Sequence, residues 1–267
     1  MKHITLDAYG GNPRQLDDIK LINETLITLA YKLKLAPICP PQIIPYYYGK
    51  VKKDIGVSSF VLLEGGHITI HTFPLRECYF LDIFTTKSFD EDQVVPFLQT
   101  RLSFELKSSV FISTDRSKPN FEMAPYSPKD DFGPHLMGEV KSSTIVDMEH
   151  MADFLENIVF DINMDPITRA FVLKSTMKNP KFLSGIIVIA QSHIALHYEY
   201  KTKKIYADVF SCRPFDYTVV RSHIEKLGEV KSLSLVARGA MHIDKIKANI
   251  AHDEHLASMK WQKIIRR

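Results

Sequence analysis

The sequence predicts an α+β fold of two similar halves, each an antiparallel sheet covered by helices, paired as an αββα sandwich-like pseudo-dimer. The main observation is an internal repeat. Residues 66–86 and 192–212 carry the same His, Asp and Phe side chains at a constant spacing of 126 positions, for example His67 and His193 (193 − 67). Neighbouring strand-like segments are also joined by hairpin-length connections, which suit antiparallel strands. A hydrophobic content of 45% is ample for packed cores.

The first half, residues 1–115, opens with the strand-like segment HITLDAY and a turn at the two glycines that follow it. Asn12 is expected to cap a helix that begins at Pro13, because proline is favoured as the first helical residue. The apolar residues that follow have helical periodicity: Leu16, Ile19, Ile22, Leu26, Leu29 and Leu33. The other elements predicted for this half are strands at 57–63, 67–73, 78–85 and 108–114 and a helix near 90–103.

A linker is predicted at residues 116–142, where prolines and glycines are frequent and periodicity is weak. The second half, residues 143–267, returns to the order of the first. Its predicted strands are at 143–148, 168–175, 184–190, 193–200, 204–211 and 231–237, and its helices are at 150–160 and 216–227.

Composition excludes several functional classes. The net charge of +3 comes from intermixed signs over 267 residues, which argues against a nucleic-acid partner. The three cysteines have no CxxC spacing, so neither a disulfide framework nor a zinc knuckle is expected, and a reducing compartment fits best. No apolar leader or membrane-spanning stretch is present. We therefore expect a cytoplasmic protein with no membrane partner.

Two positions break the repeat and point to one reactive site. Gly66 occupies the position of Ser192, and Thr86 occupies that of Cys212. Only the second copy thus carries both a hydroxyl and a thiol. Taken alone, a serine between two strands is a turn residue, and a lone cysteine is a small buried hydrophobe.

Each copy also contains a His-x-x-x-His pair, at 67/71 and at 193/197. On a strand, residues four apart face the same way. Neither pair has a third ligand at a usable sequence spacing, so no metal site is predicted.

The phrases LDAYGGNP, GVSSFVLLEGGHITIHTFP, DIFTT, SGIIVIAQSHIALH and ADVFSC resemble, nearly end to end, the S-adenosylmethionine decarboxylase family of pyruvoyl enzymes. Short-chain members carry Ser-His-x-x-x-His at a self-cleavage point and a cysteine 20 residues after the serine. Ser192, His193, His197 and Cys212 reproduce this spacing (212 − 192). The family has a further serine eight residues before the cleavage serine, and it is matched by Ser184 and, in the other half, by Ser58.

The resemblance implies a self-processing decarboxylase of polyamine biosynthesis. The chain would be cut between Gln191 and Ser192, and Ser192 would become a pyruvoyl group that forms a Schiff base with the amine of a small-molecule substrate. Cys212 would be the proton donor. In fused, duplicated members one site survives, and here it would combine Ser192 and Cys212 with Ser58 and His71. The fifth catalytic candidate is His197. By the same motif it belongs with Ser184 beside the N-terminal copy, which lacks the serine and the cysteine and is called the vacant copy.

Three positions depart from the family pattern around the substrate. Gln191 stands where a glutamate usually precedes the cleavage serine. Leu75 stands where a glutamate holds the ribose hydroxyls of the nucleoside substrate, and leucine accepts no hydrogen bond. The aromatic residue expected to stack on adenine is missing, although Tyr47 and its two tyrosine neighbours lie close in sequence. Leu75, Tyr47 and Gln191 are therefore the candidate substrate-binding residues.

Three functions remain open at this point. S-adenosylmethionine is the first expectation for the substrate because of the family resemblance. Loss of the glutamate at Leu75 favours, as an alternative, decarboxylation of a basic amino acid such as ornithine or arginine. A third alternative is an inactive regulatory homologue, because one copy has lost its reactive residues. Assembly into a homo-oligomer is also left open.

Overall fold

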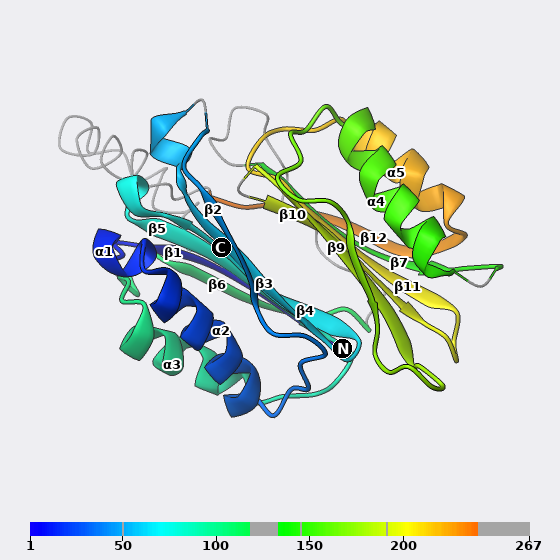
Figure 1. The fold of residues 1–267 in the computed structure, drawn as a ribbon, viewed down its shortest axis with the longest axis horizontal. Coiled ribbons are helices and arrows are strands. Elements are labelled where there is room, and N and C mark those ends of the chain that lie inside the picture. Colours follow the sequence, from blue (N-terminus) through cyan, green and yellow to red (C-terminus); the bar gives the residue numbers. More distant parts are fainter. Residues whose placement is uncertain (50, 118–132, 145, 191, 240–267) are drawn as a thin grey trace, which may run out of the picture.

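The computed structural model describes residues 1–49, 51–117, 133–144, 146–190 and 192–239. Within these ranges the chain forms two six-stranded antiparallel sheets that face each other (Figure 1). The strands of the first sheet are, in spatial order, β2 (Gln42–Tyr46), β3 (Gly56–Leu63), β4 (Gly66–Phe73), β5 (Cys78–Thr85), β1 (Lys2–Tyr9) and β6 (Val110–Asp115).

The second sheet repeats the order of the first. Its strands are, from the matching edge, β8 (Phe171–Lys174), β9 (Phe182–Ile189), β10 (Ser192–Glu199), β11 (Lys204–Phe210), β7 (Pro134–Lys141) and β12 (Glu229–Ala237). Each strand of the first sheet thus has a counterpart in the second. The predicted α+β fold of two similar halves is confirmed.

Helices cover the outer face of each sheet (Figure 1). The first sheet is covered by α1 (Pro13–Leu16), α2 (Ile19–Lys32) and α3 (Val94–Arg101), and the second by α4 (Met148–Asp161) and α5 (Tyr217–Lys226). Short 3₁₀ turns lie at η1 (Lys52–Asp54), η2 (Pro74–Arg76) and η3 (Glu91–Gln93). The resulting order of layers is helix, sheet, sheet, helix.

The single helix predicted from Pro13 is wrong, because the chain forms two helices. The Asn12 side chain caps the first of them at the amide of Arg14, as expected. The Asp18 side chain then accepts a 2.9 Å hydrogen bond from the Leu21 amide and so begins a new helix. Ile19 consequently lies 41% exposed at the start of this second helix and does not join the buried stripe.

The strand predicted at 143–148 is also wrong. The strand lies at β7, inside the stretch expected to be a linker. Seven of the eight residues of β7 are buried, so the strand lacks the alternating pattern of a half-exposed strand. Its proline and glycine therefore led to the prediction of a linker. Strand β2 was not predicted either. The division of the chain into domains at residues 116–142 stays a prediction, and residues 118–132 lie outside the described part.

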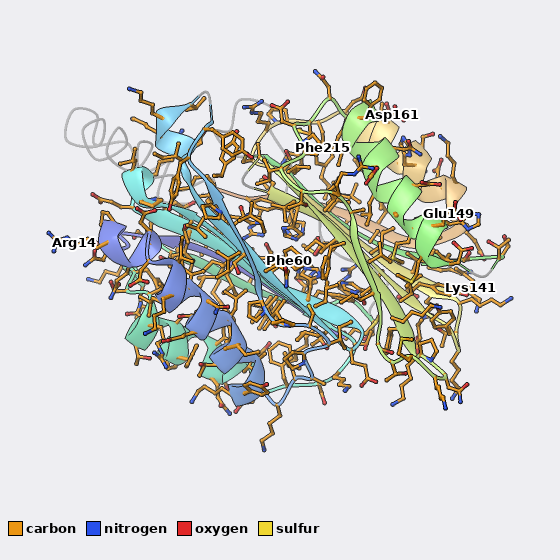
Figure 2. The ribbon with its side chains drawn as sticks, viewed as in Figure 1. Arg14, Phe60, Lys141, Glu149, Asp161 and Phe215 are labelled. Atoms are coloured by element: carbon orange, nitrogen blue, oxygen red, sulfur yellow. The ribbon has the colours of Figure 1, made fainter. Side chains whose placement is uncertain are left out.

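One apolar core lies between each sheet and its helices. Each half of the chain is therefore a helix–sheet unit with a core of its own. Between the sheets the packing is mixed. One apolar cluster joins residues of both halves at Phe60, Leu62, Ile186, Val188 and Ala195. A second one comprises Tyr9, Phe73, Cys78, Phe80 and Phe210. Polar and charged side chains fill the remaining part of this layer, and they include the residues singled out by the repeat. Figure 2 shows the side chains in this layer, with Phe60 labelled among them.

Among the described residues, no helix is long and apolar enough to cross a membrane.

Candidate active site

Ser192 and Cys212 lie side by side at the end of the second sheet. Ser192 is the first residue of β10 and is fully buried, and Cys212 follows the end of β11. The Cys212 amide donates a 2.7 Å hydrogen bond to Ser192 Oγ. The Cys212 thiol donates to the carbonyl oxygen of Ala190 at 3.1 Å. The thiol therefore contacts residue 190, and the hydroxyl belongs to residue 192. Gln191, between them in the sequence, lies outside the described residues.

The first half supplies a serine–histidine pair to the same region. Ser58 on β3 and His71 on β4 are register partners, and Ser58 Oγ lies 2.8 Å from His71 Nδ1. The other ring nitrogen of His71, Nε2, lies 2.9 Å from Nδ1 of His193. His193 is the residue after Ser192. The fold thus places Ser58 and His71 of the first sheet against His193 of the second sheet, the residue that follows the candidate cleavage serine.

The protonation of these groups follows from burial. Burial, and next the neighbouring His193 ring, lower the pKa of His71 well below its ordinary value, so its ring is neutral at neutral pH. Burial raises the pKa of the Cys212 thiol, so the thiol keeps its proton. A neutral imidazole that can accept a proton and a protonated thiol that can donate one are both present.

A comparison with known families matches this architecture. The model of the family described as S-adenosylmethionine decarboxylase matches residues 2–116 and 135–235, one segment in each half. The chain belongs to the S-adenosylmethionine decarboxylase family. Members of this family are pyruvoyl-dependent decarboxylases, which are lyases.

Individual relatives resemble one half of the chain. The S-adenosylmethionine decarboxylase proenzyme of Clostridium botulinum (strain Langeland) is 33% identical over 104 residues, which are 39% of this chain and 84% of that protein. The proenzyme of Geobacillus sp. (strain WCH70) is 24% identical over 109 residues, 41% of this chain and 82% of that protein. Nearly a whole relative thus aligns with less than half of this chain, in agreement with the duplication.

The vacant copy is arranged like the candidate site but lacks its reactive groups. Ser184 Oγ lies 2.8 Å from His197 Nδ1, and His197 Nε2 lies 2.8 Å from Nδ1 of His67. The residue before His67 is Gly66. His197 therefore lies on the glycine side of the layer, and its role stays a prediction.

The backbone at Gly66 has no space for a side chain. A Cβ atom placed there would overlap the carbonyl oxygen of Phe84 on the adjacent strand. The Thr86 amide bonds to the Gly65 carbonyl at 3.1 Å, whereas its counterpart Cys212 bonds to a serine hydroxyl. Loss of the serine is thus built into the local backbone of this copy.

The candidate substrate-binding residues lie in different surroundings. Leu75 is 58% exposed in η2. Tyr47 is 49% exposed, and its hydroxyl donates to Asp17 at 2.8 Å, an interaction that helps to raise its pKa to about 12 after desolvation. Their part in substrate binding stays a prediction.

The sequence analysis grouped Tyr46 with Tyr47 and Tyr48 and chose Tyr47, but Tyr46 is the one that lies nearer the reactive groups. Tyr46, at the end of β2, is buried, and its pKa is raised mainly by burial and then by Tyr48. Smaller electrostatic influences on it come from Arg213, Asp165 and Cys212. Tyr46 is the last residue of β2 and Tyr47 lies beyond it, and burial along β2 does not alternate, so no strand pattern in the sequence separates the two.

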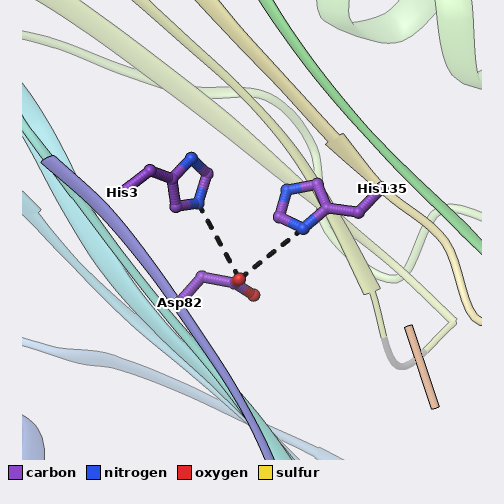
Figure 3. A group of neighbouring side chains, drawn as sticks. All are labelled: His3, Asp82 and His135. Carbon is purple, nitrogen blue, oxygen red and sulfur yellow. Dashed lines mark ion pairs between the residues drawn. The ribbon is translucent and has the colours of Figure 1, made fainter. Parts of the chain in front are cut away.

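A buried arginine was also missed. Figure 3 shows Asp82 between His3 and His135, with Asp82 Oδ1 3.9 Å from His3 Nε2 and 3.7 Å from His135 Nδ1. The Arg238 guanidinium enters this group and lies 2.6 Å from Asp82 Oδ1 and 3.0 Å from His135 Nδ1. Arg238 also pairs with Asp7. Arg238 directly follows β12 and is far in sequence from Asp7 and Asp82, so only the fold reveals these contacts.

Proposed function

We propose that this chain is a proenzyme that cleaves itself between Gln191 and Ser192 and then decarboxylates S-adenosylmethionine, a reaction of polyamine biosynthesis. One observation carries the proposal. Ser192 and Cys212 of the second half meet the Ser58–His71 pair of the first half through the 2.9 Å contact between His71 and His193. Such a composite site is what a fused duplication with one surviving copy requires.

Self-cleavage begins at the Ser192 hydroxyl. Its oxygen adds to the carbonyl carbon of Gln191, the peptide C–N bond breaks, and the proton lost by the hydroxyl is transferred to the released nitrogen. The amide has then become an ester. Removal of the Ser192 α-proton expels Gln191 as a carboxylate and leaves a dehydroalanine. Hydrolysis of this residue releases ammonia and leaves a pyruvoyl group at the start of the smaller chain.

The surrounding residues have distinct parts in this proposal. The Cys212 amide holds Ser192 Oγ in place through its hydrogen bond. Ser58 orients His71, whose ring is a base for the processing steps. The pyruvoyl group, once formed, supplies a carbonyl that binds the substrate amine as a Schiff base and accepts the electrons left by departing carbon dioxide. The Cys212 thiol then donates a proton to the carbon that has lost carbon dioxide.

Intact mass measurement of the purified protein tests the proposal. The expected result is two chains that separate between Gln191 and Ser192, with the smaller one blocked to N-terminal sequencing. The Ser192→Ala variant should remain a single chain and release no carbon dioxide from carboxyl-labelled S-adenosylmethionine. A wild-type chain that stays intact and inactive would contradict the proposal and favour the inactive regulatory homologue.

A second candidate substrate is favoured by Leu75. A leucine cannot bind two ribose hydroxyls, so the nucleoside part of S-adenosylmethionine would lose a charged partner. Decarboxylation of a basic amino acid, ornithine or arginine, needs the same carbonyl and no ribose contact. Release of carbon dioxide from labelled ornithine, arginine and S-adenosylmethionine, measured on one preparation, decides between them. Turnover of S-adenosylmethionine alone would exclude the second candidate.

A further inference from the structure

Three buried side chains between the sheets direct atoms without hydrogen-bond partners toward one point. They are His67 on β4, His193 on β10 and Asp208 on β11, and no part of them reaches solvent. Within the described residues, Nε2 of both histidines and Oδ2 of Asp208 make no hydrogen bond. We propose that these three side chains bind a divalent transition-metal ion of the zinc class.

The separations of the three atoms suit coordination. Asp208 Oδ2 lies 3.1 Å from His67 Nε2 and 3.8 Å from His193 Nε2, and all three atoms lie within 4.8 Å of one another. Donors bound tetrahedrally at zinc distances of 2.0–2.1 Å are about 3.3 Å apart. His67 Nε2 is close enough to Asp208 Oδ2 for a hydrogen bond but does not make one, because a proton on Nε2 would not point at the oxygen. An ion between the atoms would satisfy all of them.

Each of the two histidines is oriented by a contact of its other ring nitrogen, Nδ1, with a further histidine. His67 Nδ1 lies 2.8 Å from His197 Nε2, and His193 Nδ1 lies 2.9 Å from His71 Nε2. When each Nδ1 carries its proton and donates it outward, each Nε2 presents a lone pair toward Asp208. Histidine ligands of metals in proteins usually donate the second ring N–H to an acceptor, and here that acceptor is another histidine nitrogen.

The neighbouring group of similar composition serves as an internal comparison. His3, Asp82 and His135, drawn in Figure 3, also cluster closely enough for a metal. There the Arg238 guanidinium already binds Asp82 and His135, so a cation is in place. Arg116, the arginine in the equivalent position of the first half, turns instead to the carbonyl oxygens of Gly138 and Ala207. Asp208 Oδ2 is left without a guanidinium.

The charges of the layer call for one more cation. Among the described residues, the layer contains three carboxylates and two guanidiniums, which belong to Asp7, Asp82, Asp208, Arg116 and Arg238. A further carboxylate, that of Glu139, pairs with Lys204 at 2.6 Å. One negative charge therefore remains in a region without solvent, where unpaired charge is strongly unfavourable. A divalent ion at Asp208 offsets this negative charge and leaves the layer with one net positive charge.

The ligand set selects the kind of ion. Two imidazole nitrogens and one carboxylate suit zinc and its neighbours, whereas magnesium and calcium prefer oxygen ligands alone. His3 Nε2 also approaches Asp208 Oδ2, at 3.6 Å. Its Nδ1 faces the Arg116 guanidinium at 3.4 Å, which can only donate, so the neutral His3 ring carries its proton on Nε2 and is not a ligand.

This site goes beyond the proposed function, because none of its atoms belongs to the reacting groups. Its consequence is positional. An ion bound to His193 would fix the ring that contacts His71, and so would couple the two halves at the residue beside Ser192. The site can be tested whether or not the chain is an active decarboxylase.

The test uses the full chain, purified with a tag that contains no histidine and measured by elemental analysis. We expect about one zinc-class ion per chain. The Ser192→Ala chain, unfolded with a chelator and refolded, should take up cobalt(II) with the visible absorption of a tetrahedral nitrogen–oxygen site. His67→Gln and Asp208→Asn should each weaken uptake more than tenfold, and His150→Gln, at an exposed histidine, should leave it unchanged.

Two results would overturn the site. One is a wild-type chain that contains no metal and gives no cobalt spectrum after refolding, in which case a proton shared with Asp208 balances the charge. The other is equal uptake by wild type and His67→Gln, which would place the ion elsewhere. Circular dichroism of each variant shows whether it is folded. If Asp208→Asn does not fold, His67→Gln and the wild-type spectrum still decide.

Discussion

Nε2 of His71 lies 2.9 Å from Nδ1 of His193, and this contact joins the two halves of the chain at the residue that follows Ser192. Its pseudo-symmetric counterpart joins His197 to His67 at 2.8 Å, beside Gly66. The two contacts are nearly the same in geometry, yet only one adjoins a serine and a thiol. Comparisons between the two copies therefore provide matched controls for the chemistry.

Ser58→Ala should slow self-cleavage about tenfold, because one oriented hydrogen bond to His71 is lost and about 1.4 kcal/mol is a factor of ten in rate. Ser184→Ala is the matched control. Ser184 is equally buried and bonds to His197 at the same 2.8 Å, but on the vacant side. A time course of precursor disappearance on denaturing gels gives both rates. Equal slowing by the two substitutions would show that the two copies are not functionally distinct.

The vacant copy should not be restored by replacing its two divergent residues. In the double variant Gly66→Ser, Thr86→Cys, the new side chain at 66 would overlap the Phe84 carbonyl, so the strands must shift. We expect a loss of roughly 1–3 kcal/mol in the free energy of unfolding and no second cleavage. Denaturant unfolding and intact mass measure the two effects. An additional fragment beginning at position 66 would contradict this expectation.

Much of the fold could be predicted because the repeat carries its own check. A strand or helix found in one half should recur in the other, and buried strands such as β4 and β10 stand between clear turns. The elements that were missed lack such signals. β7 is buried on both faces and contains Pro134 and Gly138, so it resembled a linker. The break before α2 depends on one capping side chain, Asp18, whose local bond outweighed a continuous apolar stripe.

The site could be predicted only as far as the motif extends. Spacing identified Ser192 and Cys212, because both lie in one repeat. It could not place Asp208 between His67 and His193, since that contact depends on how the two sheets face each other. The sequence analysis found no third ligand for a metal for this reason. Arg238 was invisible for the same reason, since its partners Asp7 and Asp82 lie in the other half.

Arg238→Met should cost about 3–5 kcal/mol of unfolding free energy, because it leaves the buried carboxylates of Asp7 and Asp82 without their cation. Arg169→Met is the control. Arg169 forms an exposed pair with Glu156 at 2.7 Å, and such surface pairs contribute only about 0–1 kcal/mol. Urea unfolding of both variants measures the difference. Similar losses for the two would mean that the inter-sheet charges are not coupled to stability.

Alkylation of Cys212 should depend on pH in a specific direction. Burial raises the pKa of this thiol, and only the thiolate reacts, so modification at neutral pH should be slower than that of a free cysteine. The rate should rise as the pH is increased beyond the ordinary thiol range. Peptide mapping after iodoacetamide treatment of the Ser192→Ala chain measures the rate at each pH, with Cys212→Ser as the blank. Rapid modification at neutral pH would indicate a thiolate and would remove Cys212 as the proton donor.

Leu75→Glu should improve S-adenosylmethionine as a substrate if the ribose lies against η2. A glutamate there would accept hydrogen bonds from the ribose hydroxyls, and bonds to a charged group contribute about 1.5–3 kcal/mol each. Because Leu75 is 58% exposed, solvent weakens this gain, and we expect roughly a tenfold lower KM. Leu75→Gln, which keeps the length without the charge, should lower KM less. A KM for S-adenosylmethionine that does not move in either variant would place the substrate away from η2.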